Sequence, residues 1–295
     1  MTGKQSMIRL MSAVAVSAIM SGAALAQKAQ DTLRIGAYQP IAIIDALYDP
    51  QPQSNLMDRV VFDTLVVYDP DSRKIAPSLA ESWSQIDPLT YEFKLRKDVK
   101  FHDGTPMDAD DVVYTVNFVL DPEAKFRFKE QRFGQFAGAE KVDQYTVRIK
   151  TKTVFAPFLP RLTTILPILP SKYHSKLADK AAFGRAPIGT GPYRVVSLDI
   201  NKGLSLIKRD SYPQANDAKY AGQVRNLQVI PLPDAGTRAA AMMVGDIEMM
   251  RDVPIDMAEN LAGMPNLGST VTSPIGSSYL LIDAAGRSGR KELQD

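Results

Sequence analysis

The stretch KFHDGTPMDADDVVYTV, residues 100–116, gathers the side chains of this chain that could most readily do chemistry. It holds His102, one of two histidines, and four aspartates within nine residues. An imidazole among carboxylates could act as an acid/base centre or bind a metal ion. The spacing, however, matches neither an H-E-x-x-H helix nor a calcium-binding loop. We therefore expect no catalytic group, no metal and no cofactor here.

The same stretch predicts a turn that leads into a capped helix. Asp103-Gly104 is a turn dipeptide, and Asp108 occupies the position of a helix N-cap. Asp111 follows three residues later and can reach back to the backbone of Asp108, as in a capping box. Met107 and Val112 have the spacing of a hydrophobic staple. The helix is expected to bury its apolar face, which consists of Val112, Val113, Val116, Val119 and Leu120.

No other segment carries a clear catalytic motif. His174 lies among lysines in SKYHSKL and is expected to be a solvent-exposed helix residue. The run GTGPY at 189–193 lacks the lysine of a phosphate-binding loop and precedes a strand, so it predicts a tight turn. The chain has no cysteine, which excludes disulfides, thiolate metal sites and a lipid-anchored cysteine. These observations favour a binding protein over an enzyme.

Hydrophobic periodicity predicts a mixed α/β fold. Alternation of apolar and polar residues indicates strands over 31–36, 90–96, 145–150, 193–198, 204–209, 224–232 and 246–250. The strands at 90–96 and 145–150 are expected to pair antiparallel, and 193–209 to form a hairpin. Apolar residues at helical spacing predict helices over 55–65, 109–120 and 236–244. Asp234 is placed to cap the last of these helices, and Gly245 to end it.

The N-terminus has the pattern of a cleaved export signal. Lys4 and Arg9 precede an apolar run over 10–26, which ends in Ala24-Leu25-Ala26. We therefore expect residues 1–26 to be removed and the protein to be secreted into the periplasm. The whole chain has 35 basic and 33 acidic residues, and loss of Lys4 and Arg9 leaves 33 of each. This balance argues against nucleic acid as a partner.

The block LAESWSQIDPLTYEFKLRKDVKFHDGTPMDADDVVYTVNFVLDP, residues 79–122, resembles the signature of family 5 extracellular solute-binding proteins. These are the oligopeptide, dipeptide and nickel-type receptors of ABC importers. The resemblance continues through DTLRIG, GTGPYRVVS and AAAMMVGDIEMM, and covers about residues 31–283.

The resemblance implies the two-lobed α/β fold of type II periplasmic binding proteins with an extra subdomain. The first lobe would comprise residues 27–68 and 187–275, and the extra subdomain residues 69–186. Residues 276–295 would begin a second lobe that is largely missing, because family members are roughly twice as long. We therefore expect this chain alone to bind solute weakly or not at all.

The resemblance also implies a monomeric receptor that carries a small, peptide-like solute to an ABC permease in the inner membrane. In such a fold, ligand meets the carboxyl ends of first-lobe strands and the crossover between lobes. The expected contacts are Tyr38, Gln39, Arg251, Asp252, Ser277, Ser278 and Tyr279. Arg251 could pair with a carboxylate of the solute, and Asp252 with an amine.

Three other interpretations remain open at this point. The solute could be an oligosaccharide, an opine or a metal chelate, because the scaffold does not dictate the solute. The chain could instead be an exported hydrolase that uses His102 with nearby aspartates. It could also be a truncated remnant without transport function, which acts through protein contacts.

Overall fold

The computed structural model describes residues 31–212, 222–264 and 267–268. Its contacts divide the chain into two units, residues 1–252 and 253–295, which we describe separately. The expected signal peptide at 1–26 and the expected crossover at Ser277, Ser278 and Tyr279 lie outside the described residues. Within the described part of the chain, no helix is both long and apolar enough to span a bilayer.

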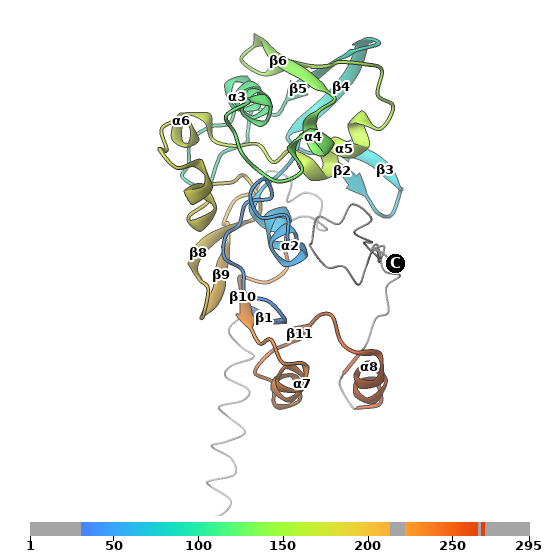
Figure 1. Ribbon diagram of the computed structural model, residues 1–295, viewed down its shortest axis with the longest axis vertical. Helices are drawn as coiled ribbons and strands as arrows, with labels where there is room; N and C mark the ends of the chain where they lie inside the picture. Colours follow the sequence, from blue (N-terminus) through green and yellow to red (C-terminus); the bar gives the residue numbers. More distant parts are fainter. Residues whose placement is uncertain (1–30, 213–221, 265–266, 269–295) are drawn as a thin grey trace, which may run out of the picture. The chain divides into compact units, whose positions relative to one another are not determined.

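A five-stranded sheet is built from segments far apart in the sequence (Figure 1). Its order is β11 (Met249–Met250), β1 (Thr32–Ala37), β10 (Asn226–Pro231), β9 (Gly203–Lys208) and β8 (Tyr193–Asp199). The first strand lies parallel to both of its neighbours, with Ile35 opposite Val229 and Met249. β8 and β9 form the predicted antiparallel hairpin.

Two helices accompany this sheet, α2 (Pro52–Val61) and α7 (Ala235–Val244). α7 begins and ends as predicted: the Asp234 side chain accepts a hydrogen bond from the backbone N–H of Thr237, and Gly245 is left-handed with φ 81°. α2 begins three residues earlier than predicted, because proline is well suited to the first turn of a helix, and it ends at Val61, four residues before the predicted end.

The strand predicted over 246–250 is shorter than expected. The ladder with β1 comprises Met249 and Met250, and the backbone N–H of Glu248 donates to the carbonyl of Arg34 just before it. The backbone N–H groups of Asp246 and Ile247 donate instead to the carbonyl of Ala241, near the end of α7. The helix end therefore takes the backbone donors that a longer strand would have used.

A second, antiparallel sheet has the order β4 (Ala80–Asp87), β5 (Thr90–Leu95), β7 (Thr146–Thr151) and β6 (Phe136–Asp143). The predicted pairing of β5 with β7 is confirmed, with Phe93 opposite Val147. A separate hairpin, β2 (Val66–Asp69) and β3 (Lys74–Pro77), precedes this sheet. The helical elements of this region are α3 (Ala109–Leu120), α4 (Lys129–Phe133), α5 (Phe158–Ile165), α6 (Ser171–His174) and the 3-10 helix η1 (Lys180–Arg185).

The start of α3 has the predicted capping box. The Asp108 side chain accepts from the backbone N–H of Asp110 at 2.9 Å, and Asp111 Oδ2 accepts from the backbone N–H of Asp108 at 3.0 Å. The other carboxylate oxygen of Asp111 accepts from the backbone N–H of Ser171 at 2.8 Å, which ties α6 to α3. Asp108 and Asp111 therefore hold backbone segments in place, and their carboxylates are not free to act as a catalytic or metal-binding group.

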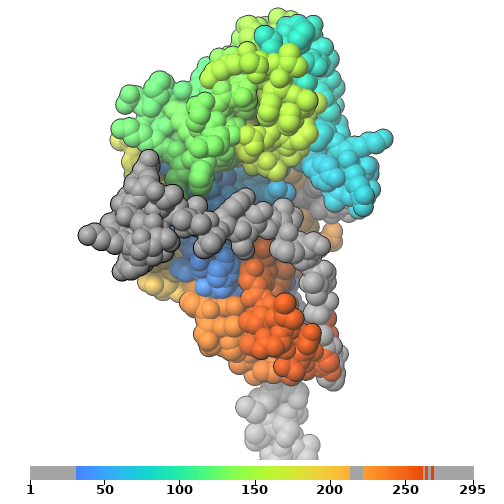
Figure 2. Space-filling view, turned by 45° about the vertical axis from the view of Figure 1, so that its right-hand side comes forward, coloured from blue at the N-terminus to red at the C-terminus, as the bar shows by residue number. Residues whose placement is uncertain are grey.

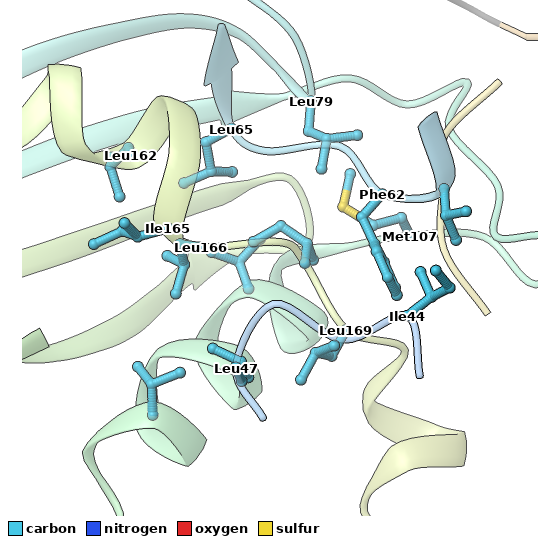
Figure 3. Close-up of a cluster of buried hydrophobic side chains, with 14 of the residues drawn as sticks. Ile44, Leu47, Phe62, Leu65, Leu79, Met107, Leu162, Ile165, Leu166 and Leu169 are labelled. Carbon is cyan, nitrogen blue, oxygen red and sulfur yellow. The ribbon is translucent and has the colours of Figure 1, made fainter. Parts of the chain in front are cut away.

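Buried apolar side chains from both sheets and their helices form one cluster. Figure 3 shows the part of this cluster where Ile44 and Leu47 meet Phe62, Leu65 and residues of the segment after β7. Burial of such side chains is the main favourable term in folding. It therefore holds the loop after β1 and the end of α2 against the second sheet.

His174 is buried, so the prediction of a solvent-exposed histidine was wrong. Its Nδ1 lies 2.6 Å from the Tyr114 hydroxyl, and the rings of Phe118 and Phe183 pack against it at 4.9 Å. Burial, and secondarily the charge of Lys180, lower the pKa of His174 to about 4. α6 is a single turn, so the lysines on either side reach solvent while the histidine faces α3.

The second unit contains one described helix, α8 (Ile255–Ala262), which begins after Pro254 and ends at Gly263.

Candidate functional site

The carboxyl ends of β1 and β11 bring four of the predicted ligand residues together. Gly36 of β1 lies opposite Met250 of β11, and both strands run in the same direction. Tyr38-Gln39 and Arg251-Asp252 therefore follow at the same edge of the sheet. Tyr38 and Arg251 are half-buried, whereas Gln39 and Asp252 are exposed. The geometry supports a shared site at this edge, and the ligand roles themselves stay predictions.

Arg238 of α7 organises this edge and was missed in the sequence. It is only 3% exposed. Its guanidinium donates to the carbonyls of Leu232 and Pro233 at 2.7 and 2.8 Å, and to that of Asp252 at 3.5 Å. One side chain thus connects the segment after β10 with the segment after β11. The sequence signal that could have revealed Arg238 is a single arginine among the small and apolar residues of GTRAAAMMV.

Gly36 leaves room for the side chain of Ile247 beside Arg238 at the end of β1. A Cβ on Gly36 would lie 2.6 Å from Ile247 Cδ1 and 3.5 Å from Arg238 Cδ. A side chain at position 36 would therefore push against the residues that hold the strand ends.

Asp252 has an unusual backbone conformation, with φ 55°. Left-handed backbone at a residue other than glycine is uncommon and is often found at functional sites. Its Oδ2 accepts a hydrogen bond from Gln53 Nε2 at 3.4 Å, and Gln53 is buried in the first turn of α2. The carboxylate is therefore oriented from the side of α2.

A second concave feature, the α2 pocket, runs along α2 and has a volume of about 1080 Å³. It is lined by Asp58, Phe62 and Asp63 on and after α2, and by residues of the β2–β3 hairpin, the segment 163–167 and the start of β8. Figure 2 shows the cyan β2–β3 hairpin projecting from the surface. None of Tyr38, Gln39, Arg251 or Asp252 lines this pocket.

Two carboxylates of residues that line this pocket have oxygens without a hydrogen-bond donor in the described chain. Asp58 is 6% exposed, and neither of its oxygens has a hydrogen-bond partner among the described residues. Burial raises its pKa well above the usual range, as do the charges of Asp45 and Asp49, against the opposing charge of Arg132. Asp63 is also buried; one of its oxygens accepts from the Tyr212 hydroxyl at 2.7 Å, and Oδ2 has no partner in the described chain.

Arg132 lines the same pocket but donates to backbone carbonyls. Its Nη1 donates to Ala46 at 2.6 Å and its Nη2 to Ile165 at 3.3 Å. Burial lowers its pKa, while Asp45 and Asp58 oppose that shift. The guanidinium thus joins the loop after β1 to the end of α5 without a hydrogen bond to Asp58.

His102 is engaged by the turn at 189–193. Its Nδ1 accepts from the backbone N–H of Gly189 at 3.2 Å, which leaves Nε2 to donate to the carbonyl of Gly191 at 3.0 Å. Burial is the main cause that lowers the pKa of His102 to about 4. A neutral imidazole with both nitrogens occupied is poorly suited to proton transfer.

The two glycines of this turn permit its close approach to α2. A Cβ on Gly189 would lie 2.0 Å from the carbonyl oxygen of Val61, and one on Gly191 would lie 2.6 Å from that of Val60. GTGPY is therefore the tight turn that was predicted. Within the described ranges, no group of three or more histidines, aspartates or glutamates could hold a metal ion.

The model of bacterial extracellular solute-binding proteins, family 5 Middle, matches residues 74–291. The chain belongs to this family. The Nickel-binding periplasmic protein of Escherichia coli is 27% identical over 242 residues, which cover 79% of this chain and 44% of that protein. Heme-binding protein A of Haemophilus influenzae is 30% identical over 235 residues, which cover 72% of this chain and 42% of that protein.

Solved structures of family members agree with the fold. The oligopeptide-binding protein AppA from Bacillus subtilis, in complex with a nonapeptide, superposes with a TM-score of 0.72 at 25% identity. The match covers 80% of this chain and 46% of that one. The fold class is therefore that of type II periplasmic binding proteins, as predicted. The chain spans less than half the length of the curated relatives it matches.

Proposed function

We propose that this chain is a solute-binding receptor that delivers a small solute, preferably a peptide, to the permease of an ABC importer. The observation that supports it best is the parallel placement of β1 and β11, which brings Tyr38-Gln39 beside Arg251-Asp252 in a chain of this family. The receptor holds and releases its solute without covalent chemistry. Membership of a family of transport-binding proteins supports this non-enzymatic role.

A peptide suits the charges at the strand ends. Arg251 offers a guanidinium to a terminal carboxylate, and Asp252 offers a carboxylate to a terminal amine. The nonapeptide complex of AppA supports this choice of solute. Because relatives include a nickel-binding and a heme-binding protein, a metal chelate is the second candidate solute.

We further propose that residues 1–26 are cleaved on export and that the receptor is a freely diffusing periplasmic monomer. In this proposal the first lobe comprises 27–68 and 187–275, the extra subdomain 69–186, and 276–295 begins the second lobe. Ser277, Ser278 and Tyr279 would add contacts at the crossover. N-terminal sequencing of the exported protein tests the cleavage point.

The solute can be identified by purifying the full-length protein, with both lobes, from the periplasm and releasing bound molecules for mass spectrometry. The same full-length protein serves as the parent in the titrations. Calorimetric titration with the recovered solute then compares the parent with Arg251→Gln and Asp252→Asn. Each variant should weaken binding about tenfold or more, because each loses one charge-assisted hydrogen bond. Asp210→Asn removes an exposed carboxylate elsewhere and serves as the matched control.

Equal affinities of the parent and of both strand-end variants would contradict the proposed site. A turnover activity that is lost in His102→Ala, with the fold retained, would instead favour the hydrolase.

A further inference from the structure

β11 lies at the edge of the five-stranded sheet, beside β1 (Figure 1). Its ladder with β1 consists of Met249 and Met250. A strand of two residues forms few backbone hydrogen bonds, so it can separate from its neighbour at little cost in free energy. Residues 251–252 follow this strand directly, so any movement of β11 changes their distance from Tyr38.

An ion pair between Arg34 of β1 and Glu248, which directly precedes β11, joins the two strands. Glu248 Oε2 accepts from the backbone N–H of Arg34 at 2.7 Å, and Oε1 accepts from Arg34 Nε at 3.1 Å. Arg34 Nη2 donates to the same carboxylate and, at 3.0 Å, to the carbonyl of Gly245 at the end of α7. The backbone N–H of Glu248 donates to the carbonyl of Arg34 at 2.9 Å. Both backbone groups of Arg34 are therefore bonded to one residue.

The Glu248 carboxylate takes the place of a backbone acceptor that a longer strand would supply. In a parallel ladder, backbone N–H and C=O groups bond to the neighbouring strand at evenly spaced positions. The chain before Met249 is still bonded to the end of α7, so a side chain provides the acceptor for the N–H of Arg34. Its hydrogen bonds are charge-assisted, and such bonds are about twice as strong as neutral ones.

The ion pair is only partly exposed to water. The side chains of Arg34 and Glu248 are 16% and 30% exposed. Burial alone would raise the pKa of Glu248, but the hydrogen bonds from the side chain and backbone of Arg34 outweigh burial and lower this pKa. Glu248 is therefore ionised at neutral pH and holds its charge-assisted bonds there.

Neither member of the pair is placed to touch a solute at the strand ends. Arg34 precedes Tyr38 by four residues, roughly 13 Å along an extended strand. Glu248 precedes Arg251 by three residues, roughly 10 Å along an extended strand. Ile247 is buried and opposes a slip of register. Loss of the ion pair should therefore let β11 separate from β1 without shifting along it.

We propose that Arg34 and Glu248 are positioning residues of the solute site: their ion pair holds β11 against β1 and so fixes the distance between Tyr38 and residues 251–252. This inference rests on the proposed function, because it assigns the pair a role in solute binding. Groups that are already ordered bind a ligand more tightly, because less conformational freedom is lost on binding. Release of β11 should therefore weaken binding although neither residue contacts the solute.

Calorimetric titration of the full-length protein with its solute tests the role in binding. Glu248→Ala should weaken binding about tenfold. Glu248→Gln keeps one oxygen for the backbone N–H of Arg34 and should weaken binding less. Glu92→Ala is the matched control, because it removes a carboxylate that pairs with Arg148 between β5 and β7 of the other sheet. This control should lower the melting temperature and leave the affinity unchanged.

An exchange of charges tests whether the two residues act as a pair. Glu248→Arg alone brings two guanidinium groups together and should weaken binding more than Glu248→Ala does. Adding Arg34→Glu restores opposite charges and should recover part of the lost affinity. A double variant that binds no better than Glu248→Arg would contradict the pairing.

Hydrogen–deuterium exchange of this chain tests the placement of β11 without any solute. The amides of residues 247–252 should exchange several-fold faster in Glu248→Ala than in the parent, because a released edge strand exposes its backbone. Glu92→Ala should leave their exchange unchanged. Equal exchange in the parent and in Glu248→Ala would show that the ion pair does not hold β11.

The two measurements separate the positioning role from the proposed function. Faster exchange of 247–252 in Glu248→Ala, together with an affinity equal to that of the parent, would overturn the positioning role. A full-length parent that binds no solute would contradict the proposed function, and the exchange of this chain would still show whether the pair holds β11. If Glu248→Ala does not fold, Glu248→Gln decides: affinity and exchange equal to those of the parent would overturn the proposal.

Discussion

The start of α3 and the second half of α2 both place aspartates in buried or half-buried positions, but the carboxylates differ in their hydrogen-bond partners. At α3, Asp108 and Asp111 accept hydrogen bonds from backbone N–H groups on two elements. On and after α2, Asp58 and Asp63 leave three carboxylate oxygens without a partner in the described chain. Acidic residue types do not by themselves mark a site; the hydrogen-bond donors around each carboxylate decide whether it stabilises the fold or opposes it.

From residue types alone, one would expect the unpaired carboxylates near His102 and not on α2. The stretch around His102 concentrates reactive groups, yet backbone groups occupy its imidazole and three of its four aspartates, and the fourth forms an exposed ion pair with Lys141. The segment NLMDRVVFDTL has an ordinary helical stripe, yet it supplies Asp58 and Asp63, which have three carboxylate oxygens without a partner in the described chain. Four substitutions test this contrast, from the largest expected effect to the smallest.

Replacing Asp111 by alanine should destabilise the protein most. The change removes half of the capping box and leaves the backbone N–H of Ser171 without its acceptor. Loss of a cap and of a buried acceptor together should lower the free energy of unfolding by about 3 kcal/mol. Urea denaturation followed by circular dichroism measures this, with the exposed Asp110→Ala in the same helical turn as the control. Equal losses in the two variants would contradict the distinction.

Asp45→Asn should stabilise the protein at neutral pH. Burial is the main cause that raises the pKa of Asp45 to about 6. Because the folded pKa lies above the unfolded pKa, the carboxyl is neutral in both states below about pH 4, and folding opposes its ionisation above about pH 6. The variant should therefore gain about 2 kcal/mol at pH 7 and nothing at low pH. Urea midpoints across this range measure the gain, and a pH-independent difference would refute the assignment.

Asp58→Leu should stabilise the protein by about 1 kcal/mol, since it removes a buried carboxyl that has no donor in the described chain. Thermal unfolding of the parent and the variant measures this gain. Destabilisation comparable to that of Asp111→Ala would show that Asp58 is paired within the fold and would remove the contrast.

Asp110→Asn should have the smallest effect. Asp110 and Lys141 form an exposed ion pair at 2.8 Å, and such pairs contribute about 0.5 kcal/mol. Raising the ionic strength should reduce even this difference in urea midpoint. A decrease in the free energy of unfolding above about 1.5 kcal/mol would mean that exposed carboxylates of α3 also contribute substantially to stability.

Local signals made much of the fold predictable. The capping box at Asp108, the alternation around Phe93 and Val147, and the left-handed glycine at 245 all depend on neighbours close in sequence. The burial of His174 was not predictable, because Tyr114 and Phe183 reach it only in the folded chain.

The candidate site was likewise predictable only in part from the sequence. The parallel pairing of β1 with β11 brings the segments that begin at Tyr38 and Arg251 to the same edge of the sheet. Their ligand roles, which the family resemblance implies, stay predictions. The contacts of Arg238 depend on the segments after β10 and β11, and the α2 pocket depends on residues of 62–78 and 163–167. No local pattern encodes the meeting of these segments.

The position of β1 has a consequence for the order in which the molecule can form. All strands of the antiparallel sheet lie within residues 80–151, so this sheet can assemble from one continuous stretch. Thr32, by contrast, is bonded to Asn226, 194 residues further along. Closing so long a loop is slow and entropically unfavourable. While the chain emerges, β1 therefore has no strand to pair with until β10 has followed. In that interval its backbone is open to chaperones and proteases.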